Sequence, residues 1–338
     1  MKIVFMGTPE FAVPSLQQLL AHHEVVAVCT QPDRPAGRGH KLHMSPIKTL
    51  ALSAGVEVLQ PNSLRMSKKP ADDAAIQSNK NAKLIRDYLV ELGADIFVVA
   101  AYGMILPRFV LDIPRLGCVN VHASLLPKYR GASPIHAAIK NGETTTGITI
   151  MYMDTGIDTG DMILQRNLPI GPKERVSSLH DRMAALGGEC IIEALAQLER
   201  GTATRSPQDD SASTYAPMIQ KSDGLIDWAW PTDRIINLTR AFDPWPGPYT
   251  MYKGETIKIW QVEKADTPEA WQSENNDARK NPPPGTILAA DPTKGLHVRT
   301  GDNSAWILEL QASGGKRMKA TDYLRGRAIV VGEQFKSE

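Results

Sequence analysis

Residues 2–29 read KIVFMGTPEFAVPSLQQLLAHHEVVAVC, and this stretch decides the expected fold. Residues 2–6 form an apolar, β-prone run, Gly7 breaks it, and residues 14–20 continue with apolar side chains at helical spacing. Residues 25–29 are a second continuous apolar run, of the kind found in parallel sheets that are covered on both faces. The stretch therefore predicts a strand, a helix and a second strand parallel to the first.

The same alternation of strands and helices continues to residue 198. Further strands are expected at residues 56–58, 96–101, 119–122 and 147–153. Helices are expected at residues 46–54, 83–92, 135–139 and 177–198. The proline- and glycine-rich stretch 31–41 is predicted to be a loop. Residues 66–81 are predicted to be a loop with a frayed helical entry, and the polar stretch 66–82 a surface insertion. This order of elements predicts an α/β fold with a doubly wound, mostly parallel sheet.

A different pattern follows residue 200. Residues 201–214 are polar and turn-rich, which is typical of a domain boundary. Short β-like runs then come at residues 256–262, 285–289, 295–300 and 305–310, which predicts a small all-β barrel. The expected domains are residues 1–205 and 214–338, joined by a linker at 206–213.

The composition excludes several classes of protein. The chain has 338 residues, of which 42% are hydrophobic and 22% charged, as in a globular enzyme. Its net charge is +1, so any contact with nucleic acid must come from local basic patches. The longest apolar stretch is too short to span a bilayer, and the first residues lack a secretory signal. Three cysteines without C-x-x-C spacing favour a reducing cytoplasm over disulfides or a thiolate zinc site.

The turn after the first strand lacks the signature of a nucleotide-binding loop. Gly7 is its single glycine, where a dinucleotide fingerprint would read G-x-G-x-x-G, and the chain has no G-x-x-x-x-G-K-[ST] motif. One glycine also suits an ordinary turn between a strand and a helix. Nicotinamide and nucleoside-triphosphate chemistry are therefore disfavoured, and no histidine has the H-E-x-x-H spacing of a metal site.

Asn120 and His122 are the first candidates for catalysis. They lie two residues apart on an expected strand, so their side chains share one face. The strand ends there, and ligands of open α/β sheets bind at the carboxyl ends of strands. An amide donor beside an imidazole suits the stabilisation of an oxyanion, and the imidazole can also move a proton. The alternative is a structural asparagine beside a buried histidine.

Residues 154–161 read DTGIDTGD and carry three acids, Asp154, Asp158 and Asp161. Their spacing lacks the D-x-[DN]-x-[DN]-G order of a calcium loop. Two interpretations remain open at this point. The segment is either a solvated turn or a turn from which one carboxylate reaches and orients the histidine at the end of the strand.

Basic residues gather in two places, which are either solvated surface or a nucleic-acid interface. The first is the loop 31–41, with Arg34, Arg38 and Lys41. The second is the last part of the chain, with Lys316, Arg317, Lys319, Arg325, Arg327 and Lys336. A small β-barrel with a basic edge is a common platform for nucleic acid.

Several long motifs, in order along nearly the whole chain, resemble the methionyl-tRNA formyltransferase family. They are FMGTPEFAVPSL at residues 5–16, QPDRPAGRG at 31–39, AYGMILP at 101–107, GCVNVHASLLPKYRGASPI at 117–135, ITIMYMDTGIDTGDM at 148–162 and RAFDPWPGPY at 240–249. The resemblance implies a Rossmann-like formyltransferase domain that binds 10-formyltetrahydrofolate. It also implies an OB-like C-terminal barrel that helps to hold the initiator methionyl-tRNA.

The resemblance also assigns individual residues. Asn120 and His122 would stabilise the oxyanion, and Asp158 would assist His122 and proton transfer. The folate contact falls on Ser124, Leu125, Leu126 and Pro127. Contacts to tRNA fall on Arg38 and Lys41 in the first domain, and Lys316, Arg317 and Lys319 are the tRNA contacts expected in the second. No metal is required, and a monomer is expected.

Two other functions fit part of the sequence. The first is a formyltransferase that acts on a UDP-linked amino sugar with the same triad, although the QPDRPAGRG loop fits the tRNA enzyme better. The second is a non-catalytic RNA-binding protein that keeps a degenerate enzyme domain. All three residues of the triad are present, which argues against the second.

Overall fold

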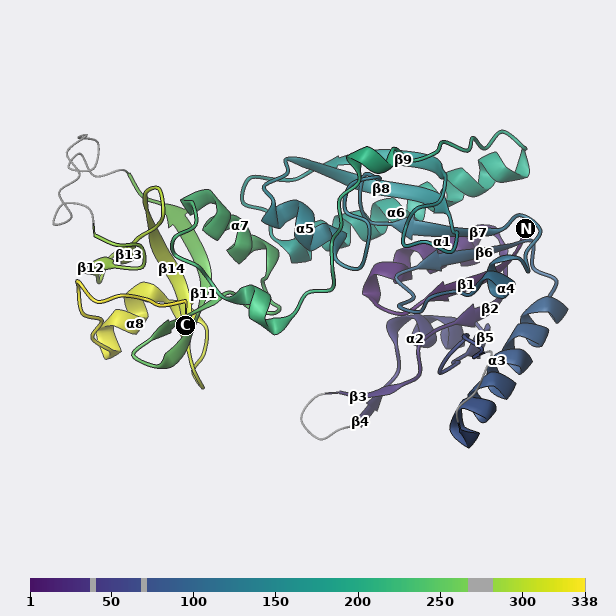
Figure 1. Cartoon of the computed structure of the whole chain (residues 1–338), viewed down its shortest axis with the longest axis horizontal. Helices are drawn as coiled ribbons and strands as arrows, with labels where there is room; N and C mark the ends of the chain where they lie inside the picture. Colours follow the sequence, from purple (N-terminus) through teal and green to yellow (C-terminus); the bar gives the residue numbers. More distant parts are fainter. Residues whose placement is uncertain (37–40, 68–71, 267–281, 338) are drawn as a thin grey trace. The chain divides into compact units, whose positions relative to one another are not determined.

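The computed structural model describes residues 1–36, 41–67, 72–266 and 282–337 (Figure 1). Contacts between residues divide the chain into two compact units. The first unit is formed by Met1–Pro134, Thr145–Pro169 and His180–Ala216, and the second by Ile135–Thr144, Ile170–Leu179 and Pro217–Glu338. The boundaries expected from the sequence, 1–205, 206–213 and 214–338, stay a prediction.

The first unit is built on a seven-stranded sheet in the order β5-β2-β1-β6-β7-β8-β9. The pairings from β5 to β7 are parallel, whereas both pairings of β8 are antiparallel. The mostly parallel sheet that the sequence predicts is therefore confirmed. Its strands are β1 (Lys2–Gly7), β2 (Glu24–Cys29), β5 (Glu57–Leu59), β6 (Ile96–Ala100), β7 (Cys118–His122), β8 (Thr145–Tyr152) and β9 (Met162–Pro169).

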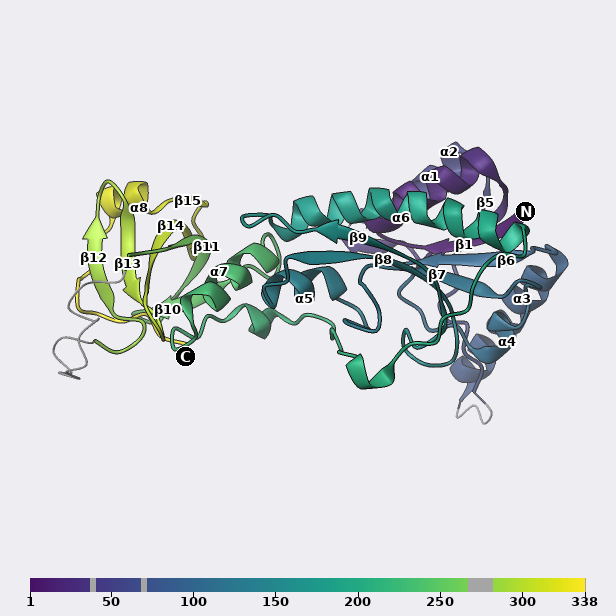
Figure 2. The same cartoon turned by 90° about the horizontal axis from the view of Figure 1, so that it is seen from above.

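Helices cover both faces of this sheet. Helices α1 (Val13–His22), α2 (Pro46–Ser53) and α6 (Val176–Glu199) lie on one face, and α3 (Asp73–Glu91) and α4 (Arg108–Leu111) lie on the other (Figure 2). Because both faces are covered, the central strands are apolar along their whole length: every residue of β6 is buried. The remaining short elements before residue 225 are η1 (Glu10–Ala12), α5 (Pro134–Lys140), η2 (Asp210–Ala212) and η3 (Lys221–Gly224).

Close packing explains why the turn after β1 contains Gly7. A Cβ atom at this position would lie 2.9 Å from Ala12 Cβ and 3.0 Å from the carbonyl oxygen of Ala100. Those distances are too short for any side chain, so the glycine lets the turn pack against β6. Packing alone therefore explains the glycine, as in an ordinary turn between a strand and a helix.

The prediction of a loop across residues 66–82 is wrong for its second half. Helix α3 begins at Asp73, and the side chain of Asp72 caps it by accepting a hydrogen bond from the Ala75 N–H at 2.8 Å. Only Ala82 and Leu89 of this helix are buried. The stretch therefore lacks the apolar periodicity that would predict a helix. The start of the helix is determined by the cap and by the helix-forming residues Ala74 and Ala75.

The loop expected at residues 31–41 is replaced in part by a β-hairpin. Strands β3 (Arg34–Ala36) and β4 (Lys41–His43) pair in antiparallel register, with Arg34 opposite His43. Arg38 lies outside the described residues. Proline and glycine in this stretch favour the prediction of a loop. The two strands have only three residues each, too few to show an alternating pattern.

The second unit contains helix α7 (Thr232–Ala241) and an antiparallel sheet in the order β10-β11-β14-β13-β12, to which β15 adds beside β14. The strands are β10 (Tyr249–Tyr252), β11 (Glu255–Lys264), β12 (Ile287–Asp291), β13 (Gly295–Arg299), β14 (Ser304–Ala312) and β15 (Met318–Lys319), followed by helix α8 (Ala320–Gly326). Four of these strands match the expected runs, whereas β10, β15 and both helices were not predicted.

The last described residues join the two edge strands of this sheet. Met251 of β10 exchanges both backbone hydrogen bonds with Lys336, at 2.9 Å each. At the other edge, the Ile287 N–H donates to the Glu333 carbonyl at 2.8 Å, and the Phe335 N–H donates to that of Gly285 at 2.9 Å. This C-terminal segment closes the sheet, which agrees with the small β-barrel expected from the sequence.

Candidate active site

Strand β7 carries Asn120 and His122 at the point where the sheet changes from parallel to antiparallel pairing. Asn120 lies between Val99 of β6 and Met151 of β8, and His122 lies opposite Thr149 of β8. Asn120 is half-buried, and no hydrogen bond to its side chain is found among the described residues. Its amide is therefore available to a ligand at the carboxyl end of the strand.

The imidazole of His122 is buried between two oxygen atoms. Its Nε2 lies 3.0 Å from the carbonyl oxygen of Tyr129, and its Nδ1 lies 3.6 Å from Oδ2 of Asp158. Only 5% of the side chain is exposed. Both ring nitrogens therefore face oxygen atoms of the protein, which fixes the orientation of the ring.

Asp158 is the acid of the DTGIDTGD loop that faces His122. Its Oδ2 accepts a hydrogen bond from the Gly131 N–H at 2.8 Å. Asp154 instead stays within the loop, where it accepts hydrogen bonds from the Gly156 N–H and the Thr159 hydroxyl. Asp161 lies 3.9 Å from Arg205. The structure thus brings Asp158, and neither of the other two, to the histidine.

The segment expected to contact folate forms a tightly bonded turn after β7. Ser124 is buried, and its hydroxyl donates to the carbonyl of Lys128 at 2.6 Å. The Thr149 hydroxyl donates to the Ser124 carbonyl, and Gln165 Nε2 donates to the carbonyl of Leu126 at 2.8 Å. Thr149 and Gln165 were not identified from the sequence. They fix the backbone of the turn rather than offering free groups to a ligand.

A cavity of about 150 Å³ adjoins Asp158. Its walls come from the loop after β6, from the end of β8 and from the loop that carries Asp158. The lining residues are Met104, Ile105, Leu106, Met151, Met153, Asp154, Thr155, Gly156, Ile157 and Asp158. A lining of mostly apolar side chains with carboxylates at one side suits a flat ring that has polar edges.

The basic residues expected to bind tRNA differ in their contacts. Lys41 begins β4, and only its backbone is described. Lys316 and Lys319 are exposed, and no ion pair to either is found within the described part of the chain. Arg317 is held by the carboxylates of Asp243 and Glu309, at 3.0 and 2.6 Å. Its charge is therefore engaged inside the second unit.

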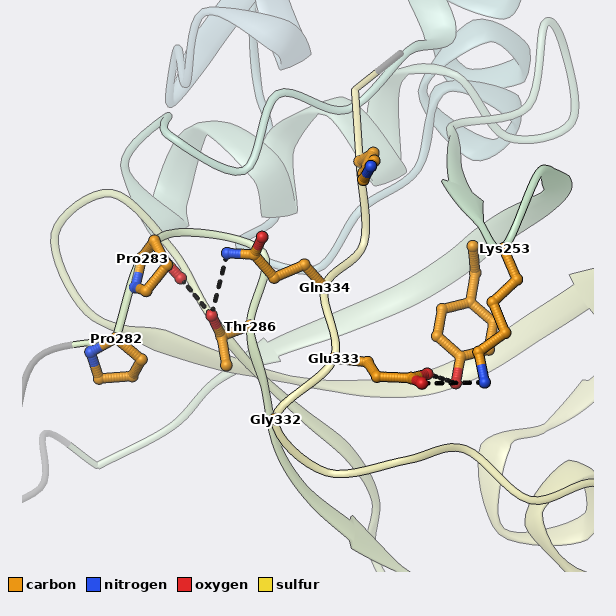
Figure 3. Close-up of a pocket in the computed structure, with 9 residues that line it drawn as sticks. Lys253, Pro282, Pro283, Thr286, Gly332, Glu333 and Gln334 are labelled. Atoms are coloured by element: carbon orange, nitrogen blue, oxygen red, sulfur yellow. Dashed lines mark hydrogen bonds and ion pairs between the residues drawn. The ribbon is translucent and has the colours of Figure 1, made fainter. Parts of the chain in front are cut away.

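Three larger cavities among the described residues contain none of the residues predicted for catalysis, folate binding or tRNA binding. The one in Figure 3 has a volume of about 670 Å³ and lies in the second unit, between β10, β12 and the C-terminal segment. Its carboxylate, Glu333, is already engaged by Lys253 at 2.9 Å and by the hydroxyl of Tyr252. Gln334 and Thr286 are also hydrogen-bonded to each other.

The described residues contain neither a cluster of metal ligands nor an exposed cysteine. Among the described residues, no cluster of histidine, cysteine and acidic side chains could hold a metal ion. All three cysteines are buried, and burial raises the pKa of Cys29 and of Cys118 to about 12 and that of Cys190 to about 11. They therefore stay thiols. Within the described ranges, no helix has the length and apolar character needed to cross a bilayer.

Comparison with protein families matches both parts of the chain. Residues 1–195 match the model of the family described as formyl transferase, and residues 218–328 match the formyl transferase C-terminal domain. A methionyl-tRNA formyltransferase of Geobacter metallireducens is 47% identical, over 98% of this chain and 97% of its own length. That of Ruminiclostridium cellulolyticum is 46% identical over 99% of each chain.

Solved structures share the fold at lower identity. An N-formyltransferase of Helicobacter canadensis, solved with folinic acid and dTDP-3-aminofucose, has a TM-score of 0.62 and 18% identity, over 94% of this chain and all of its own. HypX of Aquifex aeolicus, solved with tetrahydrofolic acid, has a TM-score of 0.57 and 18% identity, over 96% of this chain and 47% of its own.

Proposed function

Because the chain belongs to the methionyl-tRNA formyltransferase family and transfers a formyl group to methionyl-tRNA, we propose that Asn120, His122 and Asp158 carry out this transfer. The observation that carries this assignment is the position of Asp158 Oδ2. It lies 3.6 Å from His122 Nδ1 and is held there by the Gly131 N–H. We propose 10-formyltetrahydrofolate as the donor.

The reaction begins when the free amino group of the methionyl ester attacks the formyl carbon. The carbonyl oxygen becomes an oxyanion, which the Asn120 amide and the His122 imidazole stabilise. The tetrahedral adduct then collapses, and the bond between the formyl carbon and the folate nitrogen breaks. The proton released by the amine passes through water to that nitrogen, assisted by Asp158. Asp158 also orients His122, whose Nδ1 lies 3.6 Å from its Oδ2.

The chain offers a place for the donor beside Asp158. The cavity that adjoins Asp158 has apolar walls from Met104, Leu106 and Met151 and suits the ring system of the folate. The turn of Ser124, Leu125, Leu126 and Pro127 begins two residues after His122, which supports a contact with the reacting end of the donor. Thr149 and Gln165 support that turn through three hydrogen bonds of 2.7–3.2 Å, and Gln165 also donates to the Thr149 hydroxyl at 3.0 Å.

We assign catalysis to residues 1–205 and the holding of tRNA to the barrel at 214–338. Formylation of a charged tRNA belongs to translation, which supports a place in the cytoplasm. One chain carries the triad, the folate segment and both units, which supports a monomer. In the first domain, Arg38 and Lys41 are the proposed tRNA contacts.

Replacing both Lys316 and Lys319 by alanine should raise the KM for methionyl-tRNA and leave the KM for the folate unchanged. Each phosphate contact that is lost should flatten the salt dependence of tRNA binding by about one in the logarithmic slope. The measurement is tRNA affinity across a salt series. Arg325→Ala is the matched control, because Arg325 is engaged by Asp322 within helix α8. An unchanged KM and slope in the double variant would remove both lysines from the interface.

The acceptor is tested by two parallel reactions with 10-formyltetrahydrofolate. One contains methionine-charged initiator tRNA, and the other contains a UDP-linked amino sugar. Formyl transfer to the tRNA alone is the expected result. Transfer to the sugar alone would keep the triad and overturn the role of the second unit. Transfer to neither would favour a degenerate enzyme that only binds RNA.

A further inference from the structure

Residues 206–216, which the sequence predicts to be mostly linker, belong to the first unit and lie next to Asp158 of the proposed triad. We call this segment the strap. At its start, Ser206 exchanges two backbone hydrogen bonds with Met162, at 2.8 and 3.0 Å. At its end, the Arg130 N–H donates to the Thr214 carbonyl at 2.9 Å, and the Ala216 N–H donates to the Arg130 carbonyl at 2.7 Å. The strap thus spans from β9 to the turn after β7.

Gln208 of the strap uses all of its hydrogen-bonding capacity on the loop and turn that hold the triad. Its Nε2 donates to the carbonyl oxygens of Asp158 and Gly160, at 2.8 Å each. Its Oε1 accepts from Nε and Nη2 of Arg130, at 3.0 and 2.9 Å. One half-buried amide therefore ties the loop of Asp158 to the turn that contacts His122.

Both segments that Gln208 joins have a backbone conformation that needs support. Asp158 has a φ of +54° and Tyr129 a φ of +61°, in the left-handed region that most side chains disfavour. These two residues are the ones whose oxygens face the nitrogens of His122. The strap also contacts Tyr129 directly, since the Tyr129 N–H donates to the hydroxyl of Thr214 at 2.8 Å.

We propose that Gln208 is a positioning residue of the formyl-transfer reaction, which holds Asp158 at the distance where it acts on His122. The inference rests on the proposed role of Asp158. Gln208 does not reach the reacting atoms itself, so it acts through the backbone of Asp158. A displacement of about 1 Å in a catalytic group is enough to cost about 10²-fold in rate. The effect should therefore fall on kcat and leave substrate binding intact.

Two variants separate the contacts of Gln208. Gln208→Glu keeps the acceptor for Arg130 and removes both N–H donors to the carbonyls of Asp158 and Gly160. Gln208→Leu removes all four hydrogen bonds at similar size. Either variant should lower kcat by about 10–10²-fold, with the KM of both substrates within about twofold and Tm unchanged within a few degrees. Where Gln208→Leu does not fold, Gln208→Glu provides the test.

Asp210→Ala is the matched control. Asp210 lies on the strap and pairs with the same Arg130, at 2.7 Å, but it is 84% exposed on the outer side. Its loss leaves the bonds of Gln208 in place, so kcat should stay within about twofold, as for most exposed ion pairs. An equal loss of kcat in Asp210→Ala would mean that the strap is only structural, and this result would overturn the proposal.

A double variant distinguishes positioning from general support of the fold. In the background of Asp158→Asn, Gln208→Glu should have little further effect on kcat, because residues that act as a unit are not additive. Independent, multiplying losses would overturn the role assigned to Gln208. A normal kcat in Asp158→Asn alone would instead overturn the proposed triad. If Asp158→Asn is slow while Gln208→Glu has normal kcat, only the positioning role fails.

Discussion

Asp158→Asn is expected to lower kcat by about 10²–10⁴-fold while the protein stays folded. Asparagine tolerates the left-handed conformation that Asp158 adopts at a φ of +54°, and its side-chain oxygen can still accept from the Gly131 N–H. The substitution therefore removes little besides the negative charge that faces His122. Alanine at this position would add backbone strain and would be harder to interpret.

The measurement is kcat with both substrates saturating, together with Tm. Asp161→Asn is the matched control, because Asp161 lies in the same loop and pairs with Arg205 instead of His122. Its kcat should stay within a few-fold of the wild-type value. A kcat for Asp158→Asn within threefold of wild type would contradict the role of this carboxylate.

Asn120→Ala is expected to lower kcat by about 10²–10³-fold, the usual result of removing one donor to an oxyanion. The fold should be unaffected, because the Asn120 side chain is half-buried and no hydrogen bond to it is found among the described residues. Its removal therefore leaves no partner unsatisfied. The affinity for the folate, measured by equilibrium binding, should change little.

Asn120→Asp provides a second test at nearly constant size. The carboxylate has no N–H to donate and would repel the developing negative charge, so the loss in kcat should be at least as large as for alanine. Near-normal turnover in either variant would remove Asn120 from the mechanism. Partial activity in Asn120→Asp above that of Asn120→Ala would contradict oxyanion stabilisation by the amide.

The parallel core strands could be predicted because burial on both faces makes them continuous apolar runs. The strands expected at 2–6, 25–29, 96–101 and 119–122 agree with β1, β2, β6 and β7 to within one residue at each end. Strand β9 was not predicted, because only Ile163 of its eight residues is buried. Its sequence therefore lacks a strong apolar pattern.

The α/β class, the barrel that follows it and the positions of Asn120 and His122 on one strand could all be predicted from the sequence. Period-two alternation and long motifs are local properties of the chain, so they can be recognised in the sequence alone. The resemblance to formyltransferases added Asp158 and the identity of the reaction.

The folded chain determines which side chains come into contact. Three acids share one loop, and the chain path places Asp158, rather than Asp154 or Asp161, 3.6 Å from His122. Gln208 lies 50 residues from Asp158 in a polar stretch without any motif, yet its amide bonds to the carbonyl of Asp158. Hydrogen bonds depend on distances of about 3 Å between atoms that are remote in sequence. No local pattern contains those distances, so the fold alone supplies them.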